Sequence, residues 1–156
     1  MKIHSLLNEG LIIPELVSLE REAVLKEMVG YLKAADQITH DKELFDKLIQ
    51  REKLGSTAIG DGIAIPHCKL KEVKSPLLAL AVSKKGVNFE SLDGKPTHVF
   101  FLVVSSPDNP GQSLQILAAV AYLVRKTGSL QKRILAAKNP SKILEIIREE
   151  EEKTQE

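Results

Sequence analysis

The sequence predicts an α/β fold in which a mostly parallel β-sheet carries helices on both faces. Two uninterrupted apolar runs, 77–82 and 99–104, have the length and composition of buried strands. Apolar residues recur at helical spacing over 19–35 and 41–50, and again after the second run, from 110 to 126. Because strands alternate with helices along the chain, helices are expected to cover both faces of the sheet.

The helices before the strands have identifiable ends. Ser5 is a candidate cap for a single helical turn that Gly10 closes. Ser18 is the expected N-cap of the helix over 19–35. The expected buried face of the next helix, 41–50, consists of Leu44, Phe45, Leu48 and Ile49.

Shorter sequence patterns lie between these predicted helices and strands. The apolar run 63–65 predicts a short buried strand, which Pro66 ends because proline lacks a backbone donor and has a fixed φ. Residues 84–96 are polar and contain Gly86 and Gly94, a composition typical of a turn-rich connection or a hairpin.

A capping box is expected after the strongest strand. Asn109 stands at the cap, Pro110 at the first helical position, and Gln112 two residues beyond it. The N-terminus of a helix directly after a central strand is also a ready anion site. Ser129 and Asn139 are expected to start two further short helices.

Composition limits the possible functions. With 156 residues, the chain is long enough for one domain with a sizeable core, and its last residues, 149–156, are highly charged and expected to fray. The net charge of +1 and the absence of Trp give no support for nucleic-acid binding. The single cysteine, Cys68, excludes a disulfide framework and a multi-cysteine zinc site. No signal peptide or membrane-spanning run is visible, so a cytoplasmic protein is expected.

One glycine-rich stretch points most directly to function. Gly60 and Gly62 bracket an acidic turn and allow positive φ or the close approach of another group. An apolar strand and Pro66 then place His67 at the mouth of a strand, on a stiff support. A neutral imidazole is nucleophilic, and a guanidinium such as that of Arg51 pairs with phosphoryl oxygens. A structural histidine in a turn is the alternative, but the pattern favours a histidine that carries phosphate transiently.

These residues also carry a family resemblance. The run Gly-Asp-Gly-Ile-Ala-Ile-Pro-His, which ends at His67, resembles the active-site signature of the enzyme IIA domains of the bacterial phosphotransferase system, in the fructose, mannitol and nitrogen-regulatory branch. The upstream Arg-Glu, the later Gly-Val-Asn-Phe and Asp-Gly-Lys-Pro, the apolar Val-Phe-Phe-Leu-Val-Val and the closing helices follow in the expected order. The resemblance covers nearly all of 1–156 and implies a single domain with a mixed sheet.

The resemblance assigns roles to individual residues. It implies that His67 accepts a phosphoryl group through its Nε2 atom and that Arg51 lies near that group. A solvated arginine at a helix end is the alternative for Arg51. The loop that contains Thr57, Gly60 and Gly62 is expected to surround the phosphate with backbone amides, without a cofactor or a metal.

The sequence departs from the family at a second position. Many members have a second histidine just before a leucine at the start of the helix that follows the capping box, whereas this chain has Ser113 there. A serine donates a hydrogen bond to a phosphoryl oxygen but supplies no positive charge. An ordinary first-turn serine is equally compatible with the pattern, and Gln112 and His98 are the next candidates to complete the site.

Cys68 follows the candidate nucleophile directly. A cysteine beside a histidine suggests a Cys–His nucleophile, and the pair also suggests zinc. The family has a small residue at this position, so a requirement for a small side chain is favoured over both.

The expected function is that of a phosphocarrier. The resemblance implies that His67 accepts a phosphoryl group from an HPr-type phosphocarrier and passes it to a cysteine of an enzyme IIB component during sugar uptake. Ile59 and Ile63 are expected to contribute to the docking surface around it. One alternative is a nitrogen-type regulatory protein, which signals by its phosphorylation state through binding other proteins. Another alternative is a degenerate domain that no longer transfers a phosphoryl group.

Overall fold

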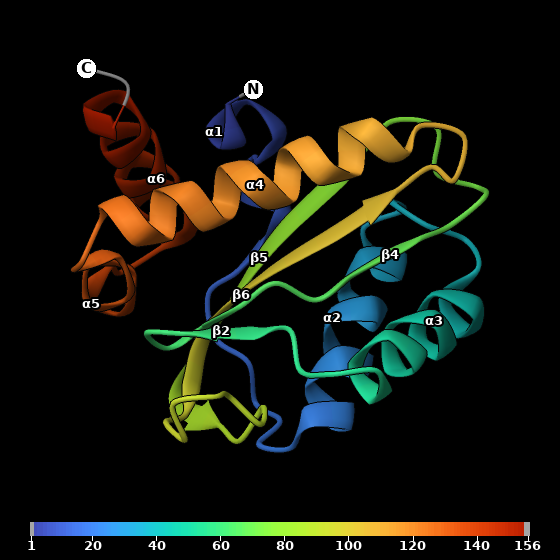
Figure 1. Ribbon diagram of the computed structural model, residues 1–156, viewed down its shortest axis with the longest axis horizontal. Helices are drawn as coiled ribbons and strands as arrows, with labels where there is room; N and C mark the ends of the chain where they lie inside the picture. The colour runs from blue at the N-terminus through green and yellow to red at the C-terminus, as the bar shows by residue number, and fades with distance from the viewer. Residues whose placement is uncertain (1, 155–156) are drawn as a thin grey trace.

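A six-stranded mixed sheet forms the centre of the computed structural model, which describes residues 2–154. Its strands lie in the order β1-β5-β6-β3-β2, and β4 also pairs with β6 (Figure 1). The strands are β1 Ile12–Ile13, β2 Ala58–Gly60, β3 Ile63–Ala64, β4 His67–Lys69, β5 Leu77–Val87 and β6 Thr97–Ser105.

The sheet is mixed, as predicted. Among the described strands, β1–β5, β3–β6 and β4–β6 are parallel pairs, whereas β2–β3 and the most extensive pair, β5–β6, are antiparallel. The β5–β6 pair joins the two predicted runs, with Leu77 opposite Val104 and Val82 opposite Val99, and β5 continues beyond its run to Val87, which lies opposite Thr97. Of the two alternatives for 84–96, a hairpin is therefore confirmed.

Helices cover both faces of this sheet. They are α1 Ile3–Leu6, α2 Arg21–Ala34, α3 Asp41–Lys53, α4 Pro110–Lys126, α5 Leu130–Ala136 and α6 Pro140–Thr154, with a 3-10 turn, η1, over Glu9–Leu11. Helices α2 and α3 lie on one side, and α1, α4, α5 and α6 lie on the other (Figure 1). None of the helices within 2–154 combines the length and apolar character that a membrane crossing requires.

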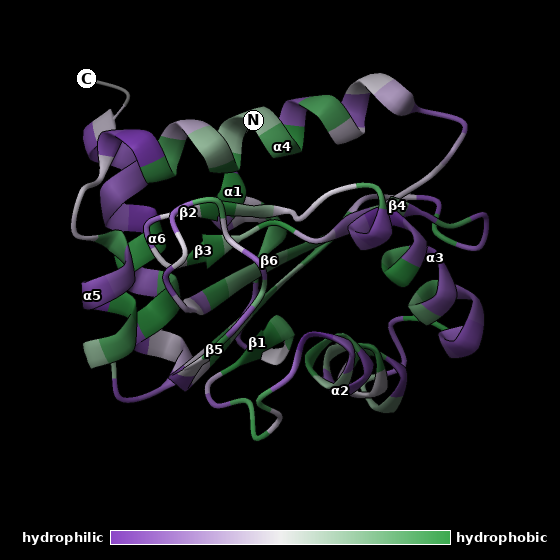
Figure 2. Ribbon diagram, turned by 60° about the horizontal axis from the view of Figure 1, so that its bottom comes forward, coloured by the Kyte–Doolittle hydropathy of each residue, from purple (hydrophilic) through white to green (hydrophobic). Residues whose placement is uncertain are grey.

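The alternation of β6 produces two hydrophobic cores. Phe100, Leu102 and Val104 face α2 and α3, whereas Phe101 and Val103 face α4 and its neighbours. Figure 2 shows these apolar strands between two helical layers, whose helices carry both hydrophobic and hydrophilic residues. Because β6 is buried on both faces, its sequence is continuously apolar, which is why this strand was predictable.

Several helix ends differ from the predictions. Helix α1 has Lys2 at its N-cap and Leu7 at its C-cap, so Ser5 lies inside it and Gly10 does not close it. Helix α2 begins at Arg21, so its N-cap position is Glu20 and Ser18 is not its cap. Helix α3 continues to Lys53, past the predicted end at residue 50. Helix α6 is not short: it runs for 15 residues from Pro140.

The predicted frayed tail is wrong as far as Thr154. The last turns of α6 are helical, and Glu151 is buried. Its carboxylate accepts hydrogen bonds from the backbone N–H groups of Ile3 (2.6 Å) and His4 (2.7 Å). A negative charge at a helix N-terminus is favourable, so the charged end of the chain anchors its beginning. Residues 155–156 lie outside the described part of the chain.

Candidate functional site

His67 is the first residue of β4, so a strand continues beyond Pro66, where the sequence predicted that it ends. Strand β3 pairs Ile63 with Val99 of β6, and β4 pairs His67 with Val103 in the same parallel register. The two short strands are thus one run along β6, interrupted at Pro66. Proline supplies no N–H to the ladder, but its carbonyl still accepts from the N–H of Val103 (3.0 Å). His67 is therefore held by backbone pairing after it and by proline before it.

The hydrogen bonds of the His67 ring fix its protonation pattern. Nδ1 lies 2.7 Å from the carbonyl oxygen of Ile65, which can only accept, so Nδ1 carries the proton. Nε2 lies 3.4 Å from Nε of Arg51, which can only donate. Nε2 therefore keeps its lone pair. His67 as a whole is half-buried, so the ring is held in place while part of the residue remains exposed.

The side chain of Arg51 is not free in solvent, although it lies near a helix end. It lies in the last turn of α3, and the same guanidinium that faces His67 donates through Nη1 to the carbonyl oxygen of Gly55 (2.8 Å). A guanidinium has further N–H groups beyond the two that these contacts use. The structure thus brings Arg51 and His67 together, with donors left for the oxygens of an anion.

Thr57 is close to this pair in the chain, but its hydroxyl is directed elsewhere. The hydroxyl donates to Oε2 of Glu52 (2.5 Å), and the backbone N–H of Thr57 donates to Oε1 (3.0 Å). The backbone amide of Thr57, which was expected among the phosphate-binding amides, is therefore already used by Glu52. Sequence reasoning noted the Arg-Glu pair but missed Glu52 as a functional candidate, because a buried carboxylate in the last turn of a helix has no local sequence signal.

The glycine turn lies away from His67. Gly60 and Gly62 have φ of +96° and +76°, so the predicted positive φ is confirmed. Gly62 directly precedes Ile63, however, and Ile63 and His67 are roughly 13 Å apart along the strand, at about 3.3 Å per residue. The expectation that Gly60 and Gly62 surround the phosphate is therefore wrong. A Cβ at Gly62 would collide with the side chain of Gln131, so this glycine permits a close contact with α5.

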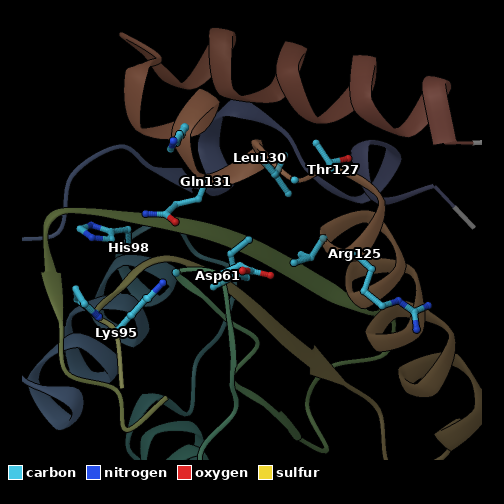
Figure 3. A pocket seen from close by; sticks show the side chains of 13 residues that line it. Asp61, Lys95, His98, Arg125, Thr127, Leu130 and Gln131 are labelled. Atoms are coloured by element: carbon cyan, nitrogen blue, oxygen red, sulfur yellow. The ribbon is translucent and has the colours of Figure 1, made fainter. Parts of the chain in front are cut away.

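A pocket of about 440 Å³ lies at this other end of the sheet. Asp61, Lys95, His98 and Gln131 contribute to its lining, and the labelled Arg125 guanidinium points away from them (Figure 3). The charges of the lining are therefore mixed. His98 belongs to this pocket, and its backbone N–H donates to the carbonyl oxygen of Gly62 (2.8 Å). His98 is consequently not available to complete the site at His67.

Ser113 lies on the same side of the sheet as His67. In a parallel pair, residues opposite each other point to the same face, and the His67 partner Val103 faces the α4 core. Ser113 is a buried residue in the first turn of α4, and its hydroxyl makes no hydrogen bond to another residue within 2–154. The predicted Asn109 cap is confirmed, since its side chain accepts from the N–H of Gln112 (3.3 Å). Ser113 as the position of a second histidine stays a prediction.

Cys68 points to the opposite face. It is next to His67 in the strand and packs against the α2 and α3 core. Burial raises the pKa of the Cys68 thiol to about 12. The thiol is therefore neutral at physiological pH, and a Cys–His nucleophile is not formed. Among residues 2–154, no group of three or more His, Cys, Asp or Glu side chains could hold a metal ion.

Exposed apolar side chains lie next to the site in the sequence. Leu54 directly follows α3 and is 85% exposed, and Leu114, next to Ser113, is 68% exposed. Ile59 is 47% exposed. Ile63, in contrast, is buried, so its predicted contribution to a docking surface is wrong.

Comparisons with known proteins identify the family of this chain. The family model "Phosphoenolpyruvate-dependent sugar phosphotransferase system, EIIA 2" matches residues 5–150. The chain is 35% identical to the fructose-specific EIIABC component of Bacillus subtilis, over 94% of this chain but only 23% of that protein. It is 32% identical to a nitrogen regulatory protein of Bradyrhizobium diazoefficiens, over 94% of this chain and 95% of that protein.

A solved structure shows the same fold. Enzyme IIA for mannitol from Escherichia coli, determined in complex with phosphorylated enzyme IIB, superposes with a TM-score of 0.74 over 92% of this chain and 97% of that chain, at 16% identity. The match of the family model to most of the chain, together with the curated relatives, shows that this chain belongs to the EIIA 2 family of the phosphoenolpyruvate-dependent sugar phosphotransferase system.

Proposed function

We propose that this protein is a phosphocarrier that holds a phosphoryl group on Nε2 of His67. One observation carries the proposal: the proton of the imidazole is held at Nδ1 by Ile65, while the lone pair of Nε2 faces the guanidinium of Arg51. A nucleophile that attacks phosphorus needs a free lone pair and nearby donors for the phosphoryl oxygens. The similarity of the chain to phosphotransferase-system relatives supports the same function.

The transfer requires no redox change. The Nε2 lone pair attacks the phosphorus of a donor phosphohistidine, a new N–P bond forms, and the electron pair of the broken N–P bond returns to the donor imidazole. In the second step a cysteine thiolate of an enzyme IIB component attacks the same phosphorus and releases His67. Throughout, Nδ1–H continues to donate to Ile65, and Arg51 shifts its free N–H groups to the equatorial oxygens.

The partners follow from this chemistry. The donor is an HPr-type phosphocarrier, and the acceptor is an enzyme IIB component, by analogy with the mannitol IIA–IIB complex of Escherichia coli. Both must dock and leave quickly, which favours a small contact with a few apolar anchors. Leu54 and Leu114 are suitable anchors, because they are exposed and adjacent in sequence to the site. We place the cycle in the cytoplasm, a reducing compartment in which a lone cysteine stays free.

The direct test is reconstitution. The protein is incubated with phosphoenolpyruvate, enzyme I and HPr, and its intact mass is measured. We expect a gain of one phosphoryl group that is labile in acid and stable in base and that requires all three components. Absence of the gain, with a known IIA domain phosphorylated in parallel, would reject the phosphocarrier and leave a degenerate domain.

A nitrogen-type regulatory function is the second candidate. The similarity to a nitrogen regulatory protein over 95% of that protein favours it, and so does Ser113 in place of a second histidine. Such a protein would accept the phosphoryl group in the same reaction but signal by binding target proteins. Addition of fructose- and mannitol-type IIB domains to the phosphorylated protein separates the two: rapid loss of phosphate to IIB supports a carrier, and retention supports a regulator.

A further inference from the structure

Glu52 is a buried carboxylate one residue after Arg51, with 3% of its surface exposed. Among residues 2–154 it has no basic partner within salt-bridge distance, and its two oxygens are instead used by one residue. Oε1 accepts the backbone N–H of Thr57 (3.0 Å), and Oε2 accepts the Thr57 hydroxyl (2.5 Å). Burial of an acidic group is costly unless hydrogen bonds compensate for it, so its place in the fold requires a reason.

Thr57 connects Glu52 to the histidine. The carbonyl oxygen of Thr57 accepts the backbone N–H of Ile65 (3.0 Å). The carbonyl oxygen of Ile65 then accepts Nδ1–H of His67 (2.7 Å). A continuous series of hydrogen bonds therefore runs from the carboxylate of Glu52 through two backbone groups to the imidazole ring.

Arg51 and Glu52 hold the same loop from neighbouring positions. Nη1 of Arg51 donates to the carbonyl oxygen of Gly55, while Glu52 holds Thr57 two residues further on. The loop between α3 and β2 is thereby fixed at two points. Its position decides where the Thr57 carbonyl meets Ile65, and so where the acceptor of Nδ1–H lies.

We propose that Glu52 is a positioning residue: through Thr57 and Ile65 it holds the His67 imidazole in the tautomer and orientation that expose the Nε2 lone pair. This deepens the proposed function and rests on it for the catalytic consequence, but the effect on the ring is independent of any transfer reaction. Small displacements of a reacting group have large kinetic effects, so a loosened ring should slow transfer even with all reacting atoms present.

The test compares substitutions that differ by one hydrogen bond. Glu52→Gln keeps the side-chain shape but replaces one of the two accepting oxygens by an amide NH₂ group. Thr57→Val removes the hydroxyl at the other end, and Thr57→Ser retains it. Glu43→Gln is the matched control, because Glu43 is an exposed residue of the same helix, α3.

Two readouts are needed. Ring ¹⁵N NMR at neutral pH should show His67 as the Nδ1–H tautomer in the wild type, in Glu43→Gln and in Thr57→Ser, and a mixture of tautomers in Glu52→Gln and Thr57→Val. Phosphoryl transfer from HPr should slow by about ten- to a hundredfold in the two perturbed variants, through kcat with KM little changed.

The outcomes are distinguishable. An unchanged tautomer in folded Glu52→Gln and in folded Thr57→Val would overturn the positioning role, and if one of these variants fails to fold, the other decides. A changed tautomer in a protein that is not phosphorylated even as wild type would support the positioning of His67 and reject the proposed function. A slower transfer that appears only in KM would place Glu52 in partner docking and overturn the proposal.

Discussion

Nδ1 of His67 donates to the carbonyl oxygen of Ile65, which lies two residues earlier in the chain, across Pro66. Donor and acceptor are so close in sequence that the proline between them fixes much of their relative geometry, because its φ is restricted. The bond assigns the proton to Nδ1 and leaves the lone pair on Nε2. The orientation of the His67 ring is therefore a property of this short segment and of the loop that packs against it.

The first prediction concerns the site of phosphorylation. His67→Ala should abolish incorporation of phosphate, and ³¹P and ¹⁵N NMR of the wild type should locate the phosphoryl group on Nε2. His98→Ala is the matched control, since Nδ1 of His98 also contacts a carbonyl oxygen, that of Ser83 (2.8 Å), but lies in the other pocket. Full phosphorylation of His67→Ala, or loss of it in His98→Ala, would contradict the assignment.

The second prediction concerns the charge at the site. Arg51→Ala should slow transfer by about ten- to a thousandfold, the range for the loss of one charge-stabilising donor. Stability should change little, because the side chain is only half-buried and its main partner is one carbonyl. Arg148→Ala, at an exposed position in α6, is the control. Single-turnover transfer from phosphorylated HPr gives the rates, and equal rates for both variants would show that Arg51 takes no part.

The third prediction concerns Ser113. A neutral hydrogen bond contributes about 1 kcal/mol net, so Ser113→Ala should slow transfer by no more than several-fold. Ser113→His should speed transfer or lengthen the lifetime of phospho-His67, most clearly below about pH 6.5, where histidine becomes charged.

Thermal unfolding of Ser113→Ala and Ser113→His is the control, because it shows whether each variant is still folded. Ser113 is only 7% exposed, so the larger side chain of histidine must be accommodated there. Transfer rates and phosphate lifetimes are measured at two pH values for folded variants. A Ser113→His protein that is stable but shows no pH-dependent effect would mean that Ser113 is an ordinary first-turn residue.

The fourth prediction concerns Cys68. Its pKa is raised by burial from 9.0 to about 12, so the thiol should resist iodoacetamide at pH 8 in the native state and react after unfolding in urea. The unfolded state loses its proton first as pH rises, so this group lowers the free energy of unfolding progressively between about pH 9 and 12. Urea titrations of the wild type and Cys68→Ala across this range measure the difference. Rapid native-state alkylation would show that the thiol is accessible and ionised.

The fifth prediction concerns docking. Leu54→Glu and Leu114→Glu should raise KM for the phosphorylated donor by about tenfold, because each places a charge in an apolar contact. Stability should be unchanged, since both side chains are exposed in the free protein. Leu92→Glu is the control: Leu92 is 96% exposed and lies between β5 and β6, away from the site. If all three variants have the same KM, the partners bind elsewhere.

The sequence alone determined the fold class and the apolar runs of the two long strands, and it predicted His67 as the candidate histidine. Residues 99–104 are apolar without interruption because β6 is buried on both faces. Such an apolar run can be recognised in the sequence of one chain alone. The Asn109 cap was equally predictable, because donor and acceptor are three residues apart. Patterns over a few neighbouring residues therefore predict burial and helix capping without knowledge of the tertiary structure.

Only the tertiary structure decided which of the predicted residues accompany His67. The glycine turn precedes His67 closely in the sequence, but an extended chain covers about 3.3 Å per residue, so Gly62 belongs to the opposite end of the sheet. Arg51 is further away in the sequence, yet α3 brings it to Nε2. The roles of Glu52 and Thr57 depend on hydrogen bonds that close a loop between a helix and a strand, and no periodicity in the sequence encodes how that loop folds back.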